Sequence, residues 1–106
     1  SASNLNLVAG TYTGVHSDNH TVTVTVDSTG MLSGHSSDGC TVAGTLSPRA
    51  KDKVLRTSMT LEGGACRQGT ETVTGVAFYD AAIQRLYSAA LNNPRTIRYL
   101  FLGIKQ

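Results

Sequence analysis

The residues of this 106-residue chain best suited to chemistry are its three histidines, two of which flank one predicted turn. His16 and His20 stand four positions apart, with Asp18 between them. Two imidazoles and a carboxylate can hold zinc. Polar residues at an exposed turn explain the same pattern, and we expect no metal site.

The third histidine, His35, is followed by serine and aspartate in the run Ser36-Ser37-Asp38. A catalytic triad is assembled by the fold from separate positions, so this adjacency is no evidence for one. The chain also lacks the G-x-S-x-G and H-E-x-x-H motifs of hydrolases and zinc proteases. We therefore expect no catalytic residue, no cofactor and no enzymatic activity.

Two cysteines, Cys40 and Cys66, stand close after glycines and far apart in the chain. The absence of a C-x-x-C pair argues against a zinc or thioredoxin-like site. We predict a disulfide between them, which indicates the periplasm or the outside of the cell because such bonds persist in oxidising compartments. The alternative is two unrelated buried thiols in a cytosolic protein.

Charge is spread unevenly along the chain, whose formal net charge is +2. Residues 1–48 carry three aspartates and no lysine or arginine, whereas residues 49–106 carry all nine basic residues. Basic and aromatic residues interleave over 95–101, as on a sheet that binds single-stranded nucleic acid, but strand alternation divides them between two faces. This division and the small net charge argue against a nucleic-acid partner.

Strands must position these residues, because short apolar/polar alternations recur from Gly10 to Ile104. The clearest, Thr21–Val26, places three valines on one face and three threonines on the other. Central glycines in several strands permit the sharp bends of a small barrel. We predict a single all-β domain over residues 10–106, an eight-stranded antiparallel up-and-down barrel. Seven strands are expected at Gly10–His16, His20–Asp27, Met31–Ser37, Cys40–Ser47, Lys53–Glu62, Thr70–Tyr79 and Thr96–Ile104.

The segment 80–93 fits two structures. Ile83, Leu86 and Tyr87 begin a helical stripe, yet Arg85–Leu91 also suits a strand of a meander. Short loops and sequential hairpins favour the strand, preceded by a short helical turn near 80–83. Residues 1–9 are expected to be disordered or a remnant of cloning, outside the domain.

An interior of eight strands is just wide enough to be filled by side chains or to hold one small ligand. Five apolar sets are expected to fill it: Val22/Val24/Val26, Val42/Leu46, Leu55/Met59/Leu61, Val73/Ala77 and Leu100/Leu102/Ile104.

The runs Gly10–Gly14, Asp27–Gly34 and Asp38–Gly44 resemble those of small bacterial envelope proteins, many of which are lipoproteins. Such proteins are calycin-like meander barrels, similar in shape to avidin-like barrels and to periplasmic lysozyme inhibitors. The resemblance implies a disulfide-bonded barrel in the periplasm or outer membrane, with a membrane link only through a removed or lost lipid anchor. Avidin-like barrels line their biotin pocket with tryptophan, and this chain has none.

The function that these features favour is binding of another protein through loops, as an enzyme inhibitor or immunity protein. The alternative is a carrier of a small apolar ligand inside the barrel. The candidate contacts are one set of loop residues, His16, Asp18, Asn19, His35, Ser36, Ser37 and Asp38, and a second, basic surface of Arg49, Lys51 and Arg95.

Overall fold

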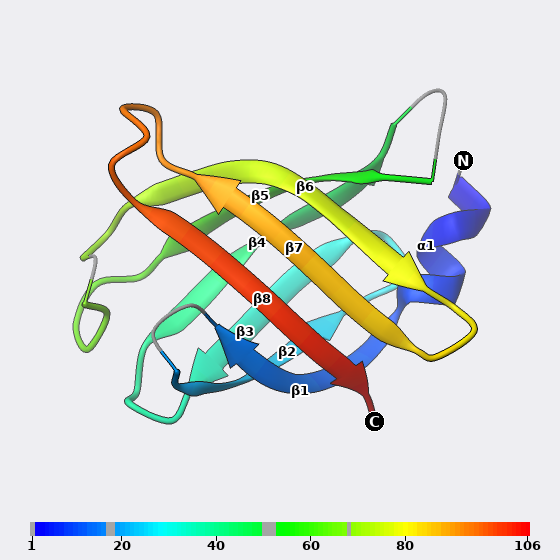
Figure 1. Ribbon diagram of the computed structural model, residues 1–106, viewed down its shortest axis with the longest axis horizontal. Helices are drawn as coiled ribbons and strands as arrows, with labels where there is room; N and C mark the ends of the chain where they lie inside the picture. The colour runs from blue at the N-terminus through cyan, green and yellow to red at the C-terminus, as the bar shows by residue number, and fades with distance from the viewer. Residues whose placement is uncertain (1, 17–18, 50–52, 68) are drawn as a thin grey trace.

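The chain forms a closed barrel in which each strand pairs with the next and the last pairs with the first, as predicted (Figure 1). The computed structural model describes residues 2–16, 19–49, 53–67 and 69–106. Its elements are α1 (Ala2–Val8), β1 (Gly10–His16), β2 (Thr21–Val26), β3 (Met31–Ser36), β4 (Thr41–Pro48), β5 (Leu55–Leu61), β6 (Thr72–Asp80), β7 (Arg85–Leu91) and β8 (Arg98–Lys105). All eight pairings are antiparallel.

The period-two pattern of the sequence decides which side chains enter the barrel on most strands. In β2 the three valines are buried, and the threonines between them face outward. In β5 the residues Leu55, Thr57, Met59 and Leu61 are all buried, as their alternation predicts. Burying one face of each strand removes apolar surface from water and provides the main stabilising free energy.

Glycines in the strands allow neighbouring backbones to approach more closely than other residues would permit. A Cβ atom placed on Gly44 would lie 2.0 Å from the carbonyl oxygen of Ser58 on β5. One placed on Gly75 would lie 2.0 Å from the carbonyl oxygen of Ala89 on β7. These contacts support the prediction that central glycines bend the barrel wall.

The barrel interior is filled by side chains. The largest fully buried ones include Tyr12, Leu55, Leu61 and Leu86. Among the described residues, a space of about 10 Å³ remains at the centre, where Thr57 and Met59 face Tyr99 and Phe101. That space is near the minimum for one water molecule, so the described interior holds no small organic ligand.

The face of β8 that points into the barrel is the opposite of the one predicted. Tyr99 and Phe101 are buried, whereas Leu100, Leu102 and Ile104 point outward. Both faces of this strand are apolar, so alternation alone does not choose between them. The larger aromatic rings fill the interior, and Phe101 lies over Gly103, where a Cβ atom would come within 2.4 Å of the ring.

Within the segment 80–93, Arg85–Leu91 forms a strand, as favoured, and the helical interpretation is wrong. β7 pairs with β6 from Thr74↔Leu91 to Asp80↔Arg85, which satisfies backbone groups that a helix would have to pair internally. Residues 81–84 form the hairpin turn in place of the expected helical turn. Gln84 closes the turn with a φ of 54°.

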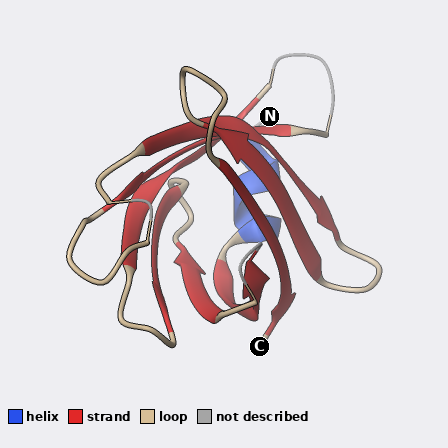
Figure 2. Cartoon of the chain, turned by 60° about the vertical axis from the view of Figure 1, so that its left-hand side comes forward, coloured by secondary structure: helices blue, strands red, loops and turns tan. Residues whose placement is uncertain are grey.

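The one helix among the described residues lies at the N-terminus, where disorder was expected for 1–9. Leu5 and Val8 of α1 are buried in the core cluster. Their spacing of three residues places both on one helix face. The Tyr12 hydroxyl donates to the Val8 carbonyl at 2.5 Å, and the Lys105 ammonium donates to the Leu7 carbonyl at 2.6 Å. These bonds satisfy carbonyls at the helix C-terminus and hold α1 across one end of the barrel (Figure 2).

Candidate protein-interaction surface

Four loops gather at the end of the barrel away from α1, at the left of Figure 1. They join β1 to β2, β3 to β4, β5 to β6, and β7 to β8. We call their described residues 19–20, 37–40, 62–67, 69–71 and 92–97 the loop face. Contacts between residues far apart in the sequence link three pairs of neighbouring loops, and a ring stack between β1 and β8 lies beneath the fourth pair.

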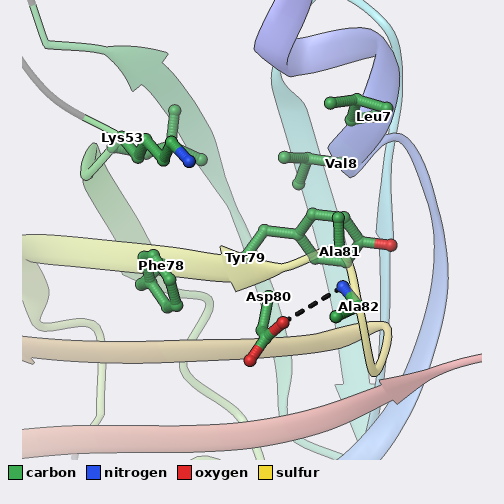
Figure 3. Close-up of a pocket in the computed structure, with 9 residues that line it drawn as sticks. Leu7, Val8, Lys53, Phe78, Tyr79, Asp80, Ala81 and Ala82 are labelled. Carbon is green, nitrogen blue, oxygen red and sulfur yellow. Dashed lines mark hydrogen bonds between the residues drawn. The ribbon is translucent and has the colours of Figure 1, made fainter.

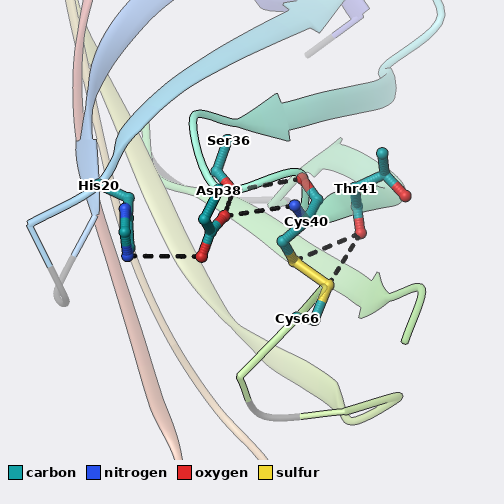
Figure 4. Close-up of a disulfide and its surroundings, with 6 residues drawn as sticks. All are labelled: His20, Ser36, Asp38, Cys40, Thr41 and Cys66. Atoms are coloured by element: carbon teal, nitrogen blue, oxygen red, sulfur yellow. Dashed lines mark hydrogen bonds and ion pairs between the residues drawn. A yellow bond between two sulfur atoms is a disulfide. The ribbon is translucent and has the colours of Figure 1, made fainter. Parts of the chain in front are cut away.

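The predicted disulfide links the β3–β4 loop to the β5–β6 loop (Figure 4). Cys40 and Cys66 are bonded, with their Cα atoms 4.4 Å apart. The Thr41 carbonyl also accepts the Glu62 amide at 3.0 Å, so a backbone bond supports the covalent one. The β5–β6 loop is thereby fixed against the turn that precedes β4.

A contact between an imidazole and a carboxylate joins the same turn to the β1–β2 loop. His20 Nε2 lies 3.4 Å from Asp38 Oδ2 (Figure 4). The other carboxylate oxygen of Asp38 accepts the Ser36 hydroxyl and, at 3.3 Å, the Cys40 amide. The Ser36 hydrogen bond, the Cys40 amide and His20 hold the pKa of Asp38 below its ordinary value of 3.8, with the hydroxyl contributing most.

A stacked pair of rings connects β1 to β8 beneath this surface. The His16 imidazole lies on the Tyr99 ring with 5.1 Å between centroids and 16° between planes. His16 is buried, and its ring centroid lies 5.9 Å from that of His20. His16, the last residue of β1, therefore packs against β8 at this end of the barrel.

Asn92 links the remaining loop, between β7 and β8, to the β5–β6 loop and was not predicted as a site residue. Its amide nitrogen donates to Glu71 at 3.0 Å and to the Thr96 hydroxyl at 3.0 Å. Its amide oxygen accepts the backbone amides of Thr96 at 2.8 Å and Ile97 at 2.9 Å. Asn92 is 4% exposed. The run Asn92-Asn93-Pro94 signals a turn in the sequence, but nothing in it identifies a buried amide as the centre of that turn.

These contacts form a ring: His20–Asp38, Cys40–Cys66, Asn92–Glu71 and His16–Tyr99. The loop face is therefore one connected surface. Its exposed side chains include Asn19, Ser37, Arg67 and Arg95. Asn19 and Arg95 have positive φ angles of 71° and 59°, so tight turns present both side chains.

The structure brings together part of the first predicted set. Asn19, Ser37 and Asp38 lie on the loop face, but His16 and Ser36 are buried beneath it. His35 is exposed on the outer wall of β3. Asp18 lies outside the described residues.

The second predicted set does not form one surface. Arg95 lies on the loop face with the first set, because the β7–β8 loop is at that end. Arg49 follows β4 at the opposite end, and Lys51 lies outside the described residues. Arg67, which was not predicted, joins Arg95 as a second exposed arginine of the loop face.

A groove lies at the opposite end, between α1 and the ends of β5 and β6 (Figure 3). Its volume is about 330 Å³, and its lining is mostly apolar. Asp80 accepts the Ala82 amide at 3.1 Å at its edge, and Lys53 stands across from it (Figure 3). The lining residues are Leu7, Val8, Lys53, Leu55, Phe78, Tyr79, Asp80, Ala81 and Ala82.

The fold and the loop face define an all-β barrel with one cross-linked end. Comparison with protein-family models, with curated proteins and with solved structures gives no match. Within the described part of the chain, no helix is long and apolar enough to cross a membrane. The same residues include no group of three histidine, cysteine, aspartate or glutamate side chains placed to hold a metal ion.

Proposed function

We propose that this protein is a non-enzymatic binding protein of an oxidising compartment, and that its loop face holds another protein. The observation that supports this proposal is the ring of contacts that fixes four loops into one surface. A surface that is already ordered loses little conformational entropy on binding, which favours affinity. It exposes Arg67 and Arg95, and arginine is one of the three residue types enriched among strongly contributing interface residues.

The disulfide supports placing the protein outside the cytoplasm, and the resemblance to small envelope barrels favours the periplasm or outer membrane. In that setting an enzyme inhibitor or an immunity protein is the role we favour, because a rigid loop surface can block an active site without doing chemistry.

Ser37, His20 and Asp38 lie side by side on the loop face, and serine, histidine and aspartate are also the catalytic residues of one class of hydrolases. The Ser37 hydroxyl lies 3.5 Å from His20 Nδ1, and His20 in turn pairs with Asp38. Acyl transfer also needs backbone amides aimed at an oxyanion. The amides of Ser37 and Gly39 already donate to the carbonyls of Thr21 and Ser36. We therefore interpret this arrangement as a link between loops, and labelling of Ser37 by a fluorophosphonate would contradict that interpretation.

The proposal is tested by removing the two arginines of the loop face. We expect Arg67→Ala combined with Arg95→Asn to abolish capture of a partner from a bacterial periplasmic extract, and asparagine suits the positive φ of residue 95. The matched control, Lys53→Ala with Arg56→Ala, removes the same charge away from the loop face and should capture normally. Inhibition of lysozyme and of secreted toxin enzymes by the same variants tests the proposed role. Equal capture by both double variants would contradict the proposal.

A second candidate function, carriage of a small apolar ligand, is favoured by the groove beside α1. The groove is large enough for a small ligand, whereas the described interior is filled. We expect Ala82→Trp to fill the groove and abolish binding of a fluorescent fatty-acid analogue. Ala89→Trp, on the outer face of β7, is the control and should leave that binding unchanged.

A further inference from the structure

The groove beside α1 leaves apolar side chains open to solvent. Leu7 on α1 and Phe78 on β6 line opposite sides of it and are 58% and 40% exposed (Figure 3). Val8 and Leu55, which also line it, are buried. The groove volume of about 330 Å³ lies at the lower end of the range for small-molecule sites. An alkyl chain lying along these walls would remove their apolar surface from water, which favours binding.

A lysine without a partner stands at the rim of this groove. Figure 3 shows Lys53 reaching toward α1 from the segment that precedes β5, with its ammonium at the tip. Within the described part of the chain, no hydrogen bond, ion pair or ring contact engages this ammonium. An ammonium at the edge of an apolar groove attracts a negatively charged group on a ligand.

The other charges around the groove leave an excess of positive charge among the described residues. Asp80, the other charged residue in the lining, accepts a backbone amide at 3.1 Å, and the strand register places Arg85 beside it on β7. The Lys105 ammonium donates to a carbonyl of α1 and lies 4.9 Å from the centre of the Tyr79 ring, which lines the groove. Three cationic side chains thus accompany one carboxylate, so the charge around the groove favours an anionic ligand.

We propose that this groove, which lies outside the barrel interior, binds single-chain amphiphiles with an anionic head group, and that Lys53 selects the head group. The proposal rests on the second candidate function, carriage of a small apolar ligand, and adds the ligand class and the residue that determines it. The alkyl chain lies along Leu7 and Phe78, and the head group stays at the rim beside Lys53. Because that charge pair is open to solvent, it contributes selectivity of only a few fold, and contact with the alkyl chain contributes most of the affinity.

The experiment is isothermal titration calorimetry at low ionic strength, where exposed charges are least screened. The ligands are decanoate, decanol and decyltrimethylammonium, which share a ten-carbon chain and are used below their micelle concentrations. An exposed charge pair contributes up to about fivefold in affinity, and between the anion and the cation attraction replaces repulsion. We therefore expect decanoate to bind about tenfold more tightly than decyltrimethylammonium, with decanol between them.

Two variants of Lys53 test its role in selecting the head group. Lys53→Met keeps an apolar stem of similar length without the charge and should reduce the preference for decanoate to about twofold, whereas Lys53→Glu should reverse it. Arg56→Glu is the matched control, because it makes the same change of charge on the outer face of β5 outside the groove and should leave the preference unchanged. Lys53 and Arg56 are both exposed, so we expect these variants to fold, which circular dichroism verifies.

Equal affinities of the unmodified chain for decanoate and decyltrimethylammonium would overturn the proposal and leave the carriage of apolar ligands standing. A preference for decanoate that Lys53→Glu leaves unchanged would have the same two consequences. We expect Ala82→Trp, which fills the groove, to abolish binding of all three ligands, and binding that persists in this variant would overturn their placement there. Binding of none of the three by the unmodified chain would overturn the second candidate function together with this proposal.

Discussion

Replacing both cysteines by serine tests how much the disulfide contributes to the ring of loop contacts. The Sγ atoms of Cys40 and Cys66 lie 3.8 and 3.6 Å from the Thr41 carbonyl oxygen. A serine hydroxyl at either position therefore has an acceptor close by. The substitution removes the covalent link while leaving the buried surroundings of Cys66 hydrogen-bonded.

The expected loss follows from the length of chain that the bond closes. For a sequence separation of 26 residues, the chain-entropy model gives a destabilisation of about 3.5 kcal/mol at 25 °C. For a domain of this size that loss lowers the melting temperature by about 15 °C. The β4–β5 ladder, from Val42↔Leu61 to Pro48↔Leu55, does not depend on the disulfide, so the barrel should still form.

Urea unfolding of the oxidised protein, the reduced protein and the double serine variant measures this loss. We expect the reduced and serine forms to agree with each other. In the reduced and serine forms, native-state hydrogen exchange at the Glu62 amide should be faster than in the oxidised protein, because this amide donates across the linked loops. A free-energy change below about 1 kcal/mol would refute the entropic reasoning, because closure of the loop in the unfolded chain would then cost almost nothing.

Three further substitutions test other contacts. Asn92→Ala leaves the amides of Thr96 and Ile97 without their acceptor and should cost about 2–3 kcal/mol in urea unfolding, whereas its exposed neighbour Asn93→Ala should cost almost nothing. Thr57→Val should raise stability by about 1 kcal/mol, because the Thr57 hydroxyl is buried without a partner among the described residues; destabilisation would indicate a bound water there. The lowered pKa of Asp38 contributes stability that is fully present above pH 3.8 and is lost as the pH falls below it. Unfolding free energies measured from pH 5 downward should therefore decline less steeply in Asp38→Asn, and identical slopes would contradict this assignment.

The barrel could be predicted because the alternation of apolar and polar residues can be recognised within each short strand of the sequence. In β2, valine and threonine alternate without exception, and only one face is apolar. The cysteines could be paired because the chain contains only two. In β8, by contrast, Leu100 and Leu102 compete with Tyr99 and Phe101 for the interior. That choice depends on which side chains fill the space left by the other strands, which no single strand specifies.

The candidate site was less predictable, because its contacts join residues distant in the sequence. The hairpin turn Asp38-Gly39 could be recognised, but its partner His20 is 18 positions away and its alignment depends on the β2–β3 register. Asn92 carries a turn signal, and only the fold brings Glu71 within reach of its amide. Arg49 and Arg95 looked alike in the sequence and lie at opposite ends because an odd number of strands separates them.

The most direct test of the protein-binding claim is site-specific photo-crosslinking in a bacterial periplasm. A benzoylphenylalanine replaces Ser37 on the loop face in one variant. In the other it replaces Thr45, which lies on the outer face of β4 and outside the loop face. We predict one discrete covalent adduct with a second protein from position 37 and none from position 45. Adducts of equal yield from both positions, or no adduct from position 37, would contradict the account.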